Sequence, residues 1–133
     1  MMKVFIMDDS QFLRERLIGM LADIYGVEVV CQAKDLPETI ESIQQFKPDM
    51  VIMDIKTSKG NRIDMLKNIK GNKRIPFVVI FTNYSSAEYR RKCIELGADF
   101  FFDKSMEFEK LVEVLKQLPE YSKLNQYSGM NVL

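Results

Sequence analysis

Several short apolar segments of this sequence end directly in polar residues that could do chemistry together. The apolar runs 3–7, 50–53 and 77–81 end at acidic or hydroxyl side chains, and a lysine follows the run 98–102. The polar set is Asp8, Asp9, Asp54, Thr82 and Lys104. Clustered carboxylates repel one another, and oxygen-only ligands favour Mg²⁺ or Mn²⁺ over Zn²⁺ as the neutralising cation. Beside a metal, a lysine and a hydroxyl, the Asp54 carboxylate could attack phosphorus and form an acyl phosphate.

Strand and helix patterns alternate along the chain, and this alternation would position the polar set. Apolar runs typical of covered strands occur at 3–7, 27–33, 50–53, 77–81 and 98–102. Helical patterns separate them, and the last two are expected at 85–96 and 107–118. The pattern predicts a doubly wound α/β fold, in which five helices cover both faces of a five-stranded parallel sheet. In such sheets the functional crevice lies beyond the carboxyl ends of the strands. If the first and third strands are neighbours, the acidic residues converge there.

Capping residues indicate where the helices begin and end. Ser10 or Asp9 can cap the first helix, and Gly26 is expected to stop it. Thr82 could also be an N-cap for the helix at 85–96. The charged stretch 88–92 is interpreted as the solvated face of that helix.

Composition and charge exclude several functional classes. At 133 residues the chain has the length of one domain, predicted at 1–119, with a polar tail at 120–133 and no output domain. Nineteen basic residues balance nineteen acidic ones, which gives no electrostatic footprint for nucleic acid or an anionic membrane. The chain has no His, so Ser-His and Cys-His catalysis and His-ligated metals are excluded. Cys31 and Cys93 are interpreted as reduced packing residues, and a cytoplasmic location is expected, without membrane insertion.

Four sequence motifs carry a resemblance to a known family. They read FIMDDSQFLRERL, PDMVIMDIK, VVIFTNYSS and GADFFFDKS, and they occur in this order over roughly residues 3–118. The chain resembles a response-regulator receiver domain, the phospho-accepting half of bacterial two-component signalling. The resemblance implies a flavodoxin-like fold with strand order 2-1-3-4-5.

The resemblance also implies a phosphoacceptor and a metal site. By position, Asp54 resembles the phosphoacceptor. Asp8 and Asp9 resemble the acidic pair that holds Mg²⁺ (or Mn²⁺) together with Asp54, and the main-chain carbonyl of Lys56 resembles a further protein ligand.

Three further residues match the switching machinery of the family. Thr82 resembles the switch hydroxyl, which acts with Asp54 and Lys104 in catalysis. Lys104 resembles the phosphate-binding lysine. Phe101 falls at the position of the switch aromatic, although packing within the strand would also explain a Phe there.

The resemblance implies signalling by phosphorylation rather than turnover of a substrate. A sensor histidine kinase or phosphotransfer protein would donate the phosphoryl group to Asp54, which would also lose it slowly by autodephosphorylation. The response would pass to a downstream protein through the helix at 85–96, the strand at 98–102 and the helix at 107–118, with homodimerisation through this face left open. No direct contact with nucleic acid is expected. Truncation of an output domain also stays open.

Some residues depart from the family pattern and keep other functions under consideration. Ser58 and Arg62 stand where receivers commonly carry Pro and Gly, so the loop after Asp54 is expected to be more mobile or to follow another path. This departure keeps open a phosphorylation-independent interaction module. A haloacid dehalogenase-type phosphatase is disfavoured because Lys56 occupies the position of its second acid. An FMN site is disfavoured because the acidic pair would repel the FMN phosphate.

Overall fold

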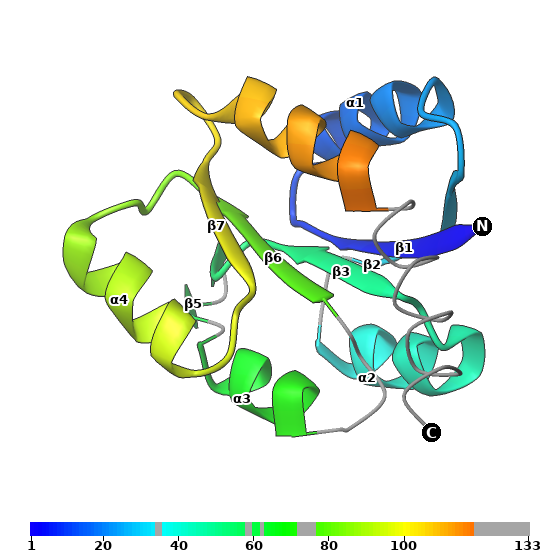
Figure 1. Ribbon diagram of the computed structural model, residues 1–133. Coiled ribbons are helices and arrows are strands. Elements are labelled where there is room, and N and C mark those ends of the chain that lie inside the picture. Colours follow the sequence, from blue (N-terminus) through cyan, green and yellow to red (C-terminus); the bar gives the residue numbers. More distant parts are fainter. Residues whose placement is uncertain (34–35, 58–59, 62, 72–76, 119–133) are drawn as a thin grey trace, which may run out of the picture.

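The computed structural model describes residues 1–33, 36–57, 60–61, 63–71 and 77–118, shown as coloured ribbon in Figure 1. The strands of its main sheet are β1 (Met2–Met7), β2 (Val27–Ala33), β3 (Met50–Met53), β6 (Phe77–Thr82) and β7 (Phe100–Asp103). They are parallel and lie in the order β2-β1-β3-β6-β7. The predicted order 2-1-3-4-5 is therefore confirmed.

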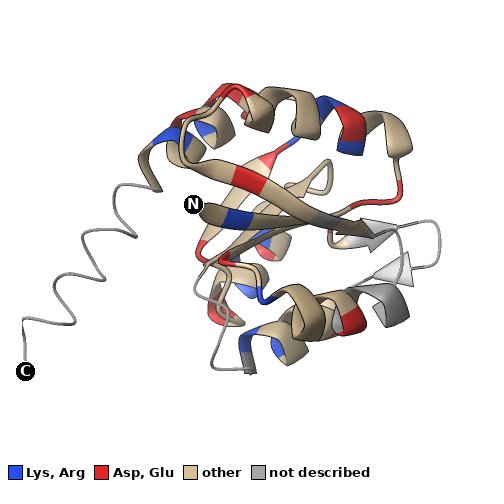
Figure 2. Ribbon diagram, turned by 90° about the vertical axis from the view of Figure 1, so that its right-hand side faces the viewer, with Lys and Arg blue, Asp and Glu red and all other residues tan. Residues whose placement is uncertain are grey.

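Helices cover both faces of this sheet, as expected for parallel strands joined by crossovers. One face carries α1 (Gln11–Ala22) and the helix at 108–118, and the other carries α2 (Leu36–Phe46), α3 (Ile63–Gly71) and α4 (Ala87–Glu95), as Figure 1 shows. None of the helices in the described ranges is long and apolar enough to cross a membrane. Basic and acidic residues are interspersed along the helices, while the strands are mostly uncharged (Figure 2).

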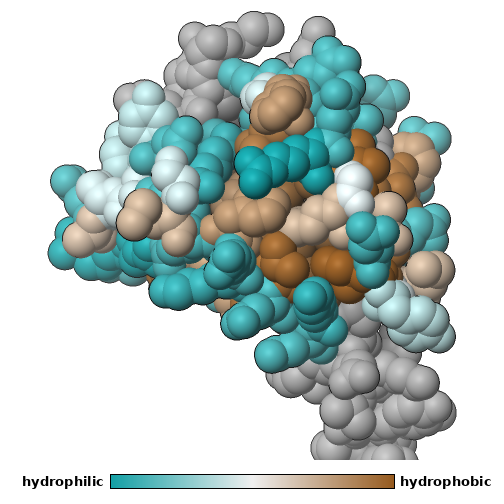
Figure 3. All heavy atoms as spheres, turned by 90° about the horizontal axis from the view of Figure 1, so that it is seen from above, coloured by the Kyte–Doolittle hydropathy of each residue, from teal (hydrophilic) through white to brown (hydrophobic). Residues whose placement is uncertain are grey.

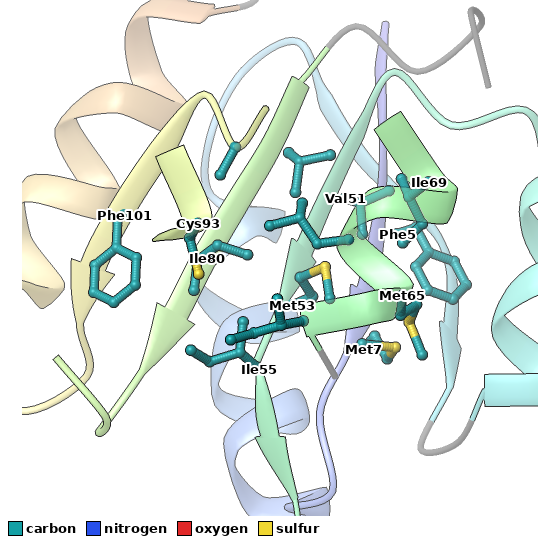
Figure 4. Close-up of a cluster of buried hydrophobic side chains, with 14 of the residues drawn as sticks. Phe5, Met7, Val51, Met53, Ile55, Met65, Ile69, Ile80, Cys93 and Phe101 are labelled. Atoms are coloured by element: carbon teal, nitrogen blue, oxygen red, sulfur yellow. The ribbon is translucent and has the colours of Figure 1, made fainter. Parts of the chain in front are cut away.

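Two apolar clusters hold the helices against the sheet. One joins strand residues such as Phe5, Val51 and Ile80 to α2, α3 and α4, and Figure 4 shows these side chains together. The other lies under α1 and the helix at 108–118, where Leu17 and Leu111 are buried. Partly buried apolar residues border this second cluster, and the view onto that face shows apolar surface among hydrophilic side chains (Figure 3).

The cap of α1 is set by Ser10 rather than by Asp9. The Ser10 side chain accepts a hydrogen bond from the Leu13 N–H at 3.2 Å, which satisfies a donor that the helix leaves unpaired. The helix ends at Ala22, and Gly26, with φ +86°, closes the turn that leads into β2. The start of α1 at Ser10 therefore holds the main chain that directly follows Asp8 and Asp9.

The last strand and the fourth helix both begin later than the sequence pattern suggests. β7 begins at Phe100, and just before it Asp99 accepts from the Val78 N–H with its carboxylate at 2.7 Å and donates its own N–H to the Val78 carbonyl at 2.9 Å. The α4 helix begins at Ala87, and Ser86 caps it by accepting from the Tyr89 N–H at 3.3 Å. The interpretation of Thr82 as the cap of this helix is therefore wrong.

A two-stranded antiparallel ribbon follows β3 and was not expected from the sequence. β4 (Lys56–Thr57) pairs with β5 (Gly60–Asn61), and Ile55 just before it is fully buried. Ser58 and Arg62, which depart from the family pattern, lie outside the described residues. The described part of this loop is thus anchored by Ile55 and paired at its base.

Cys93 offers a test of the packing around α4. Its side chain is fully buried and not disulfide-bonded, and burial raises the pKa of its thiol to about 11. An unfolded thiol ionises near pH 8.5, so the free energy of unfolding should fall between roughly pH 8.5 and 11, where only the unfolded state is deprotonated. Urea unfolding of wild type and Cys93→Ala over this range measures the effect, and the Ala variant should fall less steeply.

Alkylation gives an independent readout of the same burial. In native buffer the peptide containing Cys93 should stay unmodified by iodoacetamide, and in denaturant it should be modified, as read by peptide mass mapping. Rapid native modification would mean that α4 does not pack on the sheet as described.

Candidate functional site

The carboxyl ends of four strands bring the predicted polar residues to one edge of the sheet. Asp8 follows β1, Asp54 follows β3, Thr82 ends β6 and Lys104 follows β7. Main-chain hydrogen bonds continue the pairing into these residues. The Asp54 N–H donates to the Met7 carbonyl at 3.2 Å, and the Lys104 N–H donates to the Thr82 carbonyl at 2.9 Å. The sheet itself therefore sets the spacing between these side chains.

Asp54 is held by donors on both of its carboxylate oxygens. Its Oδ1 accepts from the Thr82 hydroxyl at 2.7 Å, and its Oδ2 accepts from the Lys104 ammonium at 2.6 Å. Only 9% of the residue is exposed, because β3 ahead of it is buried along its whole length. A carboxylate this enclosed stays charged at low cost only when such donors surround it. Asp54 is thus oriented by residues from two other strands.

Lys104 bridges two buried carboxylates. Its Nζ lies 2.6 Å from Asp54 Oδ2 and 2.7 Å from Asp8 Oδ2, and its side chain is 14% exposed. Burial acts to lower the pKa of this ammonium, but the hydrogen bonds and charges of Asp54 and Asp8 outweigh burial, so the pKa of Lys104 is raised above its usual value. The lysine therefore remains charged at neutral pH and offsets the repulsion between the two acids.

The two members of the acidic pair have different surroundings. Asp8 is 4% exposed, and besides Lys104 its Oδ1 accepts from the Ser10 N–H at 2.8 Å. Asp9 is exposed. Consecutive residues at a strand end direct their side chains differently, which explains the contrast. Across the described ranges, no three acidic or cysteine side chains form a group that could hold a metal, so the expected convergence of all three aspartates is not seen.

The donor chemistry of this edge nevertheless fits a hard divalent cation. Asp8 and Asp54 direct carboxylate oxygens at one shared positive charge, the Lys104 ammonium, and no imidazole competes because the chain has no His. Mg²⁺ typically takes one or two carboxylates and completes its shell with water and phosphate oxygens, so a ready cluster of three acids is not required. Metal binding by Asp8, Asp9, Asp54 and the Lys56 carbonyl stays a prediction.

Thr82 lies inside the site rather than at a helix cap. It is fully buried, and while its hydroxyl donates to Asp54, its Oγ1 accepts from the Tyr84 N–H at 3.2 Å. Tyr84 itself is 43% exposed. The hydroxyl thus connects the acidic site to the loop that leads into α4. The side chain of Lys56 is outside the described residues, and only its main chain is placed, in β4.

Phe101 points into the core on the α4 side of the sheet, 4% exposed, while the rings of Phe100 and Phe102 stack on the opposite face. This alternation is the one that a strand imposes. Figure 4 shows Phe101 on β7 at the margin of the α2–α4 cluster, near Cys93 and Ile80. The structure places Phe101 in the core and leaves its role as a switch a prediction.

Arg90 of α4 is a contact residue that the sequence interpretation missed. Its guanidinium lies 4.7 Å from the Phe101 ring centroid, donates to the Phe101 carbonyl at 2.9 Å and pairs with Glu107 at 2.7 Å. The interpretation of this stretch as a solvated face holds only in part for Arg90, whose side chain is 41% exposed but makes these contacts. The helical spacing in the sequence could show which side of α4 Arg90 lies on. It cannot show which residues of other elements face that side.

Removing the Lys104 ammonium should expose the repulsion that it offsets. In Lys104→Met the carboxylates of Asp8 and Asp54 lose their shared cation, and we expect the free energy of unfolding at pH 7 to fall by about 3 to 5 kcal/mol. Urea denaturation without divalent cations measures this. Lys67→Met, which removes an exposed lysine of α3, should change little.

The double variant Lys104→Met/Asp8→Asn checks the cause of that loss. Neutralising Asp8 removes the repulsion, so part of the lost stability should return. If the double variant is less stable than Lys104→Met alone, the bridge is not relieving repulsion between the two acids.

The Arg90–Glu107 pair predicts a pH dependence at acid pH. The hydrogen bond from Arg90 lowers the pKa of Glu107. A lowered folded-state pKa contributes stability above the unfolded value, near 4.3, and this stability is lost as pH falls through the folded value. In Glu107→Gln, the decline of unfolding free energy below about pH 5 should be shallower, measured by urea unfolding. Glu109→Gln, at an exposed position of the same helix, should keep the wild-type slope, and an unchanged slope in Glu107→Gln would contradict the prediction.

The sequence model of the response regulator receiver domain matches residues 4–116. Among curated proteins, the chain is 31% identical over 116 residues to a protein-glutamate methylesterase/protein-glutamine glutaminase of Methanospirillum hungatei, covering 86% of this chain and 34% of that protein. It is 30% identical over 130 residues to an uncharacterized response regulatory protein of Vibrio cholerae, covering 98% of this chain and 54% of that protein. The chain thus spans about a third to about half the length of these relatives.

Solved structures of receiver domains have the same architecture. The response regulator domain of Thermotoga maritima CheB superimposes with a TM-score of 0.72 at 28% identity, covering 90% of this chain and 94% of that one. A signal receiver domain from Colwellia psychrerythraea superimposes with a TM-score of 0.81 at 20% identity, covering 90% and 99%, and shows likeness of fold alone. With Asp54, Thr82 and Lys104 meeting at the carboxyl edge of this sheet, and the family match spanning residues 4–116, the chain belongs to the response regulator receiver domain family.

Proposed function

We propose that Asp54 accepts a phosphoryl group from the phosphohistidine of a partner histidine kinase or phosphotransfer protein, and that the modified chain signals through protein contacts. The observation that carries this proposal is the position of Asp54, whose two oxygens are held by Thr82 and Lys104 at 2.7 and 2.6 Å. The chain has no His and cannot supply such a donor itself.

The transfer needs little covalent chemistry from the protein. One Asp54 oxygen attacks phosphorus in line, the new O–P bond forms as the P–N bond to the donor imidazole breaks, and the imidazole leaves with a proton. Lys104 already contacts this carboxylate and can follow the charge onto the phosphoryl oxygens. The Thr82 hydroxyl, which donates to the Asp54 carboxylate in the unmodified protein, can instead donate to a phosphoryl oxygen.

Asp8, Asp9, Asp54 and the main-chain carbonyl of Lys56 would hold Mg²⁺ or Mn²⁺. When bound, the cation supplies neutralisation of the phosphoryl charge. Because Lys104 already pairs with Asp8 and Asp54, the protein has one cation in place before any metal binds. Lys104 would be the residue that moves from Asp8 toward the phosphoryl group.

The proposed response travels from Thr82 to the face formed by α4, β7 and the helix at 108–118. If the Thr82 hydroxyl turns to the phosphoryl group, the hydrogen bond that its oxygen accepts from the Tyr84 N–H changes. Tyr84 lies in the loop that leads into α4. Arg90 connects α4 to the Phe101 carbonyl and to Glu107. Phosphorylation would thus shift an existing equilibrium of this face and change its affinity for a downstream protein or a second copy of the chain.

One observation favours a second function, a receiver-like interaction module that works without phosphorylation. Lys104 satisfies both Asp8 and Asp54 in the unmodified protein. A fold that neutralises its own acidic site is stable without a metal and could present the same face to a partner unmodified.

The test is the intact mass of the protein after incubation with acetyl phosphate and Mg²⁺. We expect one phosphoryl adduct on wild type, which does not form when Mg²⁺ is chelated before the incubation and is absent from Asp54→Ala. Asp64→Ala, at an exposed acid of α3, should be modified like wild type. Folded wild type without an adduct would sink the phospho-accepting proposal and favour the interaction module.

A further inference from the structure

Arg14 of α1 reaches back to the main chain of the acidic site. Its Nη1 donates a hydrogen bond to the Asp8 carbonyl, and its Nε donates to Gln32 Oε1 at 3.0 Å (α1 and β2 in Figure 1). The contact with Asp8 is partly buried. Neither the predicted chemistry nor the proposed transfer assigns any role to this residue, although its guanidinium is held against the main chain of Asp8.

The hydrogen bond acts on a whole peptide unit. Because the peptide group is planar, fixing the Asp8 carbonyl oxygen also fixes the nitrogen and Cα of Asp9. One guanidinium contact therefore holds the peptide unit that joins Asp8 to Asp9, including the Cα atoms of both residues. A hydrogen bond from a charged donor is stronger than one between neutral groups, so it restrains this unit well.

The second contact of Arg14 ties the same unit to the sheet. Gln32 lies in β2 and pairs with Ile6 of β1, one residue before the end of each strand. A guanidinium donates from several fixed positions in one plane, so one acceptor just after β1 and another in β2 hold it in one orientation. The arginine thus braces the Asp8–Asp9 unit against β2, while the Ser10 N–H and Lys104 hold the Asp8 carboxylate.

We propose that Arg14 is the positioning residue of the acidic pair and that it sets the affinity of the site for Mg²⁺. This inference rests on the proposed function, since it assumes that Asp8 and Asp9 bind the cation. Residues that orient metal ligands without touching the metal typically change metal affinity by about 10- to 100-fold. Arg14 would act in this way through the main chain.

Arg16 provides a matched control on the same helix. Its guanidinium lies 4.5 Å from the centroid of the Phe108 ring, over the helix at 108–118. Replacing it removes the same charge and a similar length of side chain two residues further along. A loss of affinity that comes only from the change in net charge should therefore appear in Arg16→Met as well.

The experiment is a calorimetric titration of MgCl₂ into wild type, Arg14→Met, Arg14→Lys and Arg16→Met. We expect the dissociation constant to rise about 10-fold or more in Arg14→Met. Arg14→Lys, which can keep the contact with Asp8 but loses the fork to Gln32, should lie between Arg14→Met and wild type. Arg16→Met should stay near wild type. The rate of phosphorylation by acetyl phosphate should recover in Arg14→Met at saturating Mg²⁺, which a general loss of structure would not allow.

A second readout needs no metal. The Ser10 N–H donates to Asp8 Oδ1 at 2.8 Å, so its hydrogen exchange reports how firmly Asp8 is held. In metal-free protein this amide should exchange faster in Arg14→Met, while core amides of β3 keep their rates. Gln32→Leu, which removes the brace and keeps the arginine, should give a smaller change in the same direction.

The outcomes separate the two proposals. If wild type binds Mg²⁺ and is phosphorylated while Arg14→Met has the same dissociation constant and the same Ser10 exchange, the role of Arg14 is wrong and the proposed function stands. If Arg16→Met weakens Mg²⁺ binding as much as Arg14→Met, charge rather than positioning explains the effect, and the inference fails. If wild type takes up neither Mg²⁺ nor phosphate, the proposed function fails and the inference fails with it.

Discussion

The site depends on two ion pairs of the Lys104 ammonium, one with Asp8 at 2.7 Å and one with Asp54 at 2.6 Å. Parallel strands bring their carboxyl ends to one edge, and this sheet places two acids there with little exposure to water. Two enclosed carboxylates side by side would destabilise the fold, because their repulsion is poorly screened away from solvent. Lys104, which follows a third strand, offsets that repulsion. The two carboxylates in turn raise the pKa of Lys104.

The same arrangement would serve the proposed phosphoryl transfer. Thr82 and Lys104 are held in contact with Asp54 before any donor arrives, so little reorganisation is needed when charge moves onto a phosphoryl group. The electrostatics that stabilise the unmodified protein are thus the electrostatics that the proposed transfer would use. A change in the charge of Asp54 must then be felt by each residue that contacts it.

Those contacts reach well beyond the acidic edge. Thr82 connects Asp54 to the Tyr84 amide, and Arg90 joins α4 to the Phe101 carbonyl and to Glu107. These groups belong to β6, α4, β7 and the start of the helix at 108–118, which are the elements of the proposed output face. Arg14 provides a comparable connection on the other side of the site, from α1 to the Asp8 carbonyl and the end of β2. The acidic edge is therefore braced from both faces of the sheet.

Local patterns in the sequence identified the five strands of the main sheet, their alternation with helices and the polar residues at their ends. Continuous apolar runs such as 50–53 and 77–82 are local signals, and a carboxylate directly after a buried strand is readable without a structure. The strand order was predicted by resemblance to a family, and the sheet confirms it. Tertiary structure alone decided which of the acids share a cation, because Asp8 and Asp9 are equivalent in sequence but only Asp8 points inward to Lys104. It also decided the contacts of Arg14 and Arg90, since the partners of a long charged side chain lie on other elements and leave no local pattern.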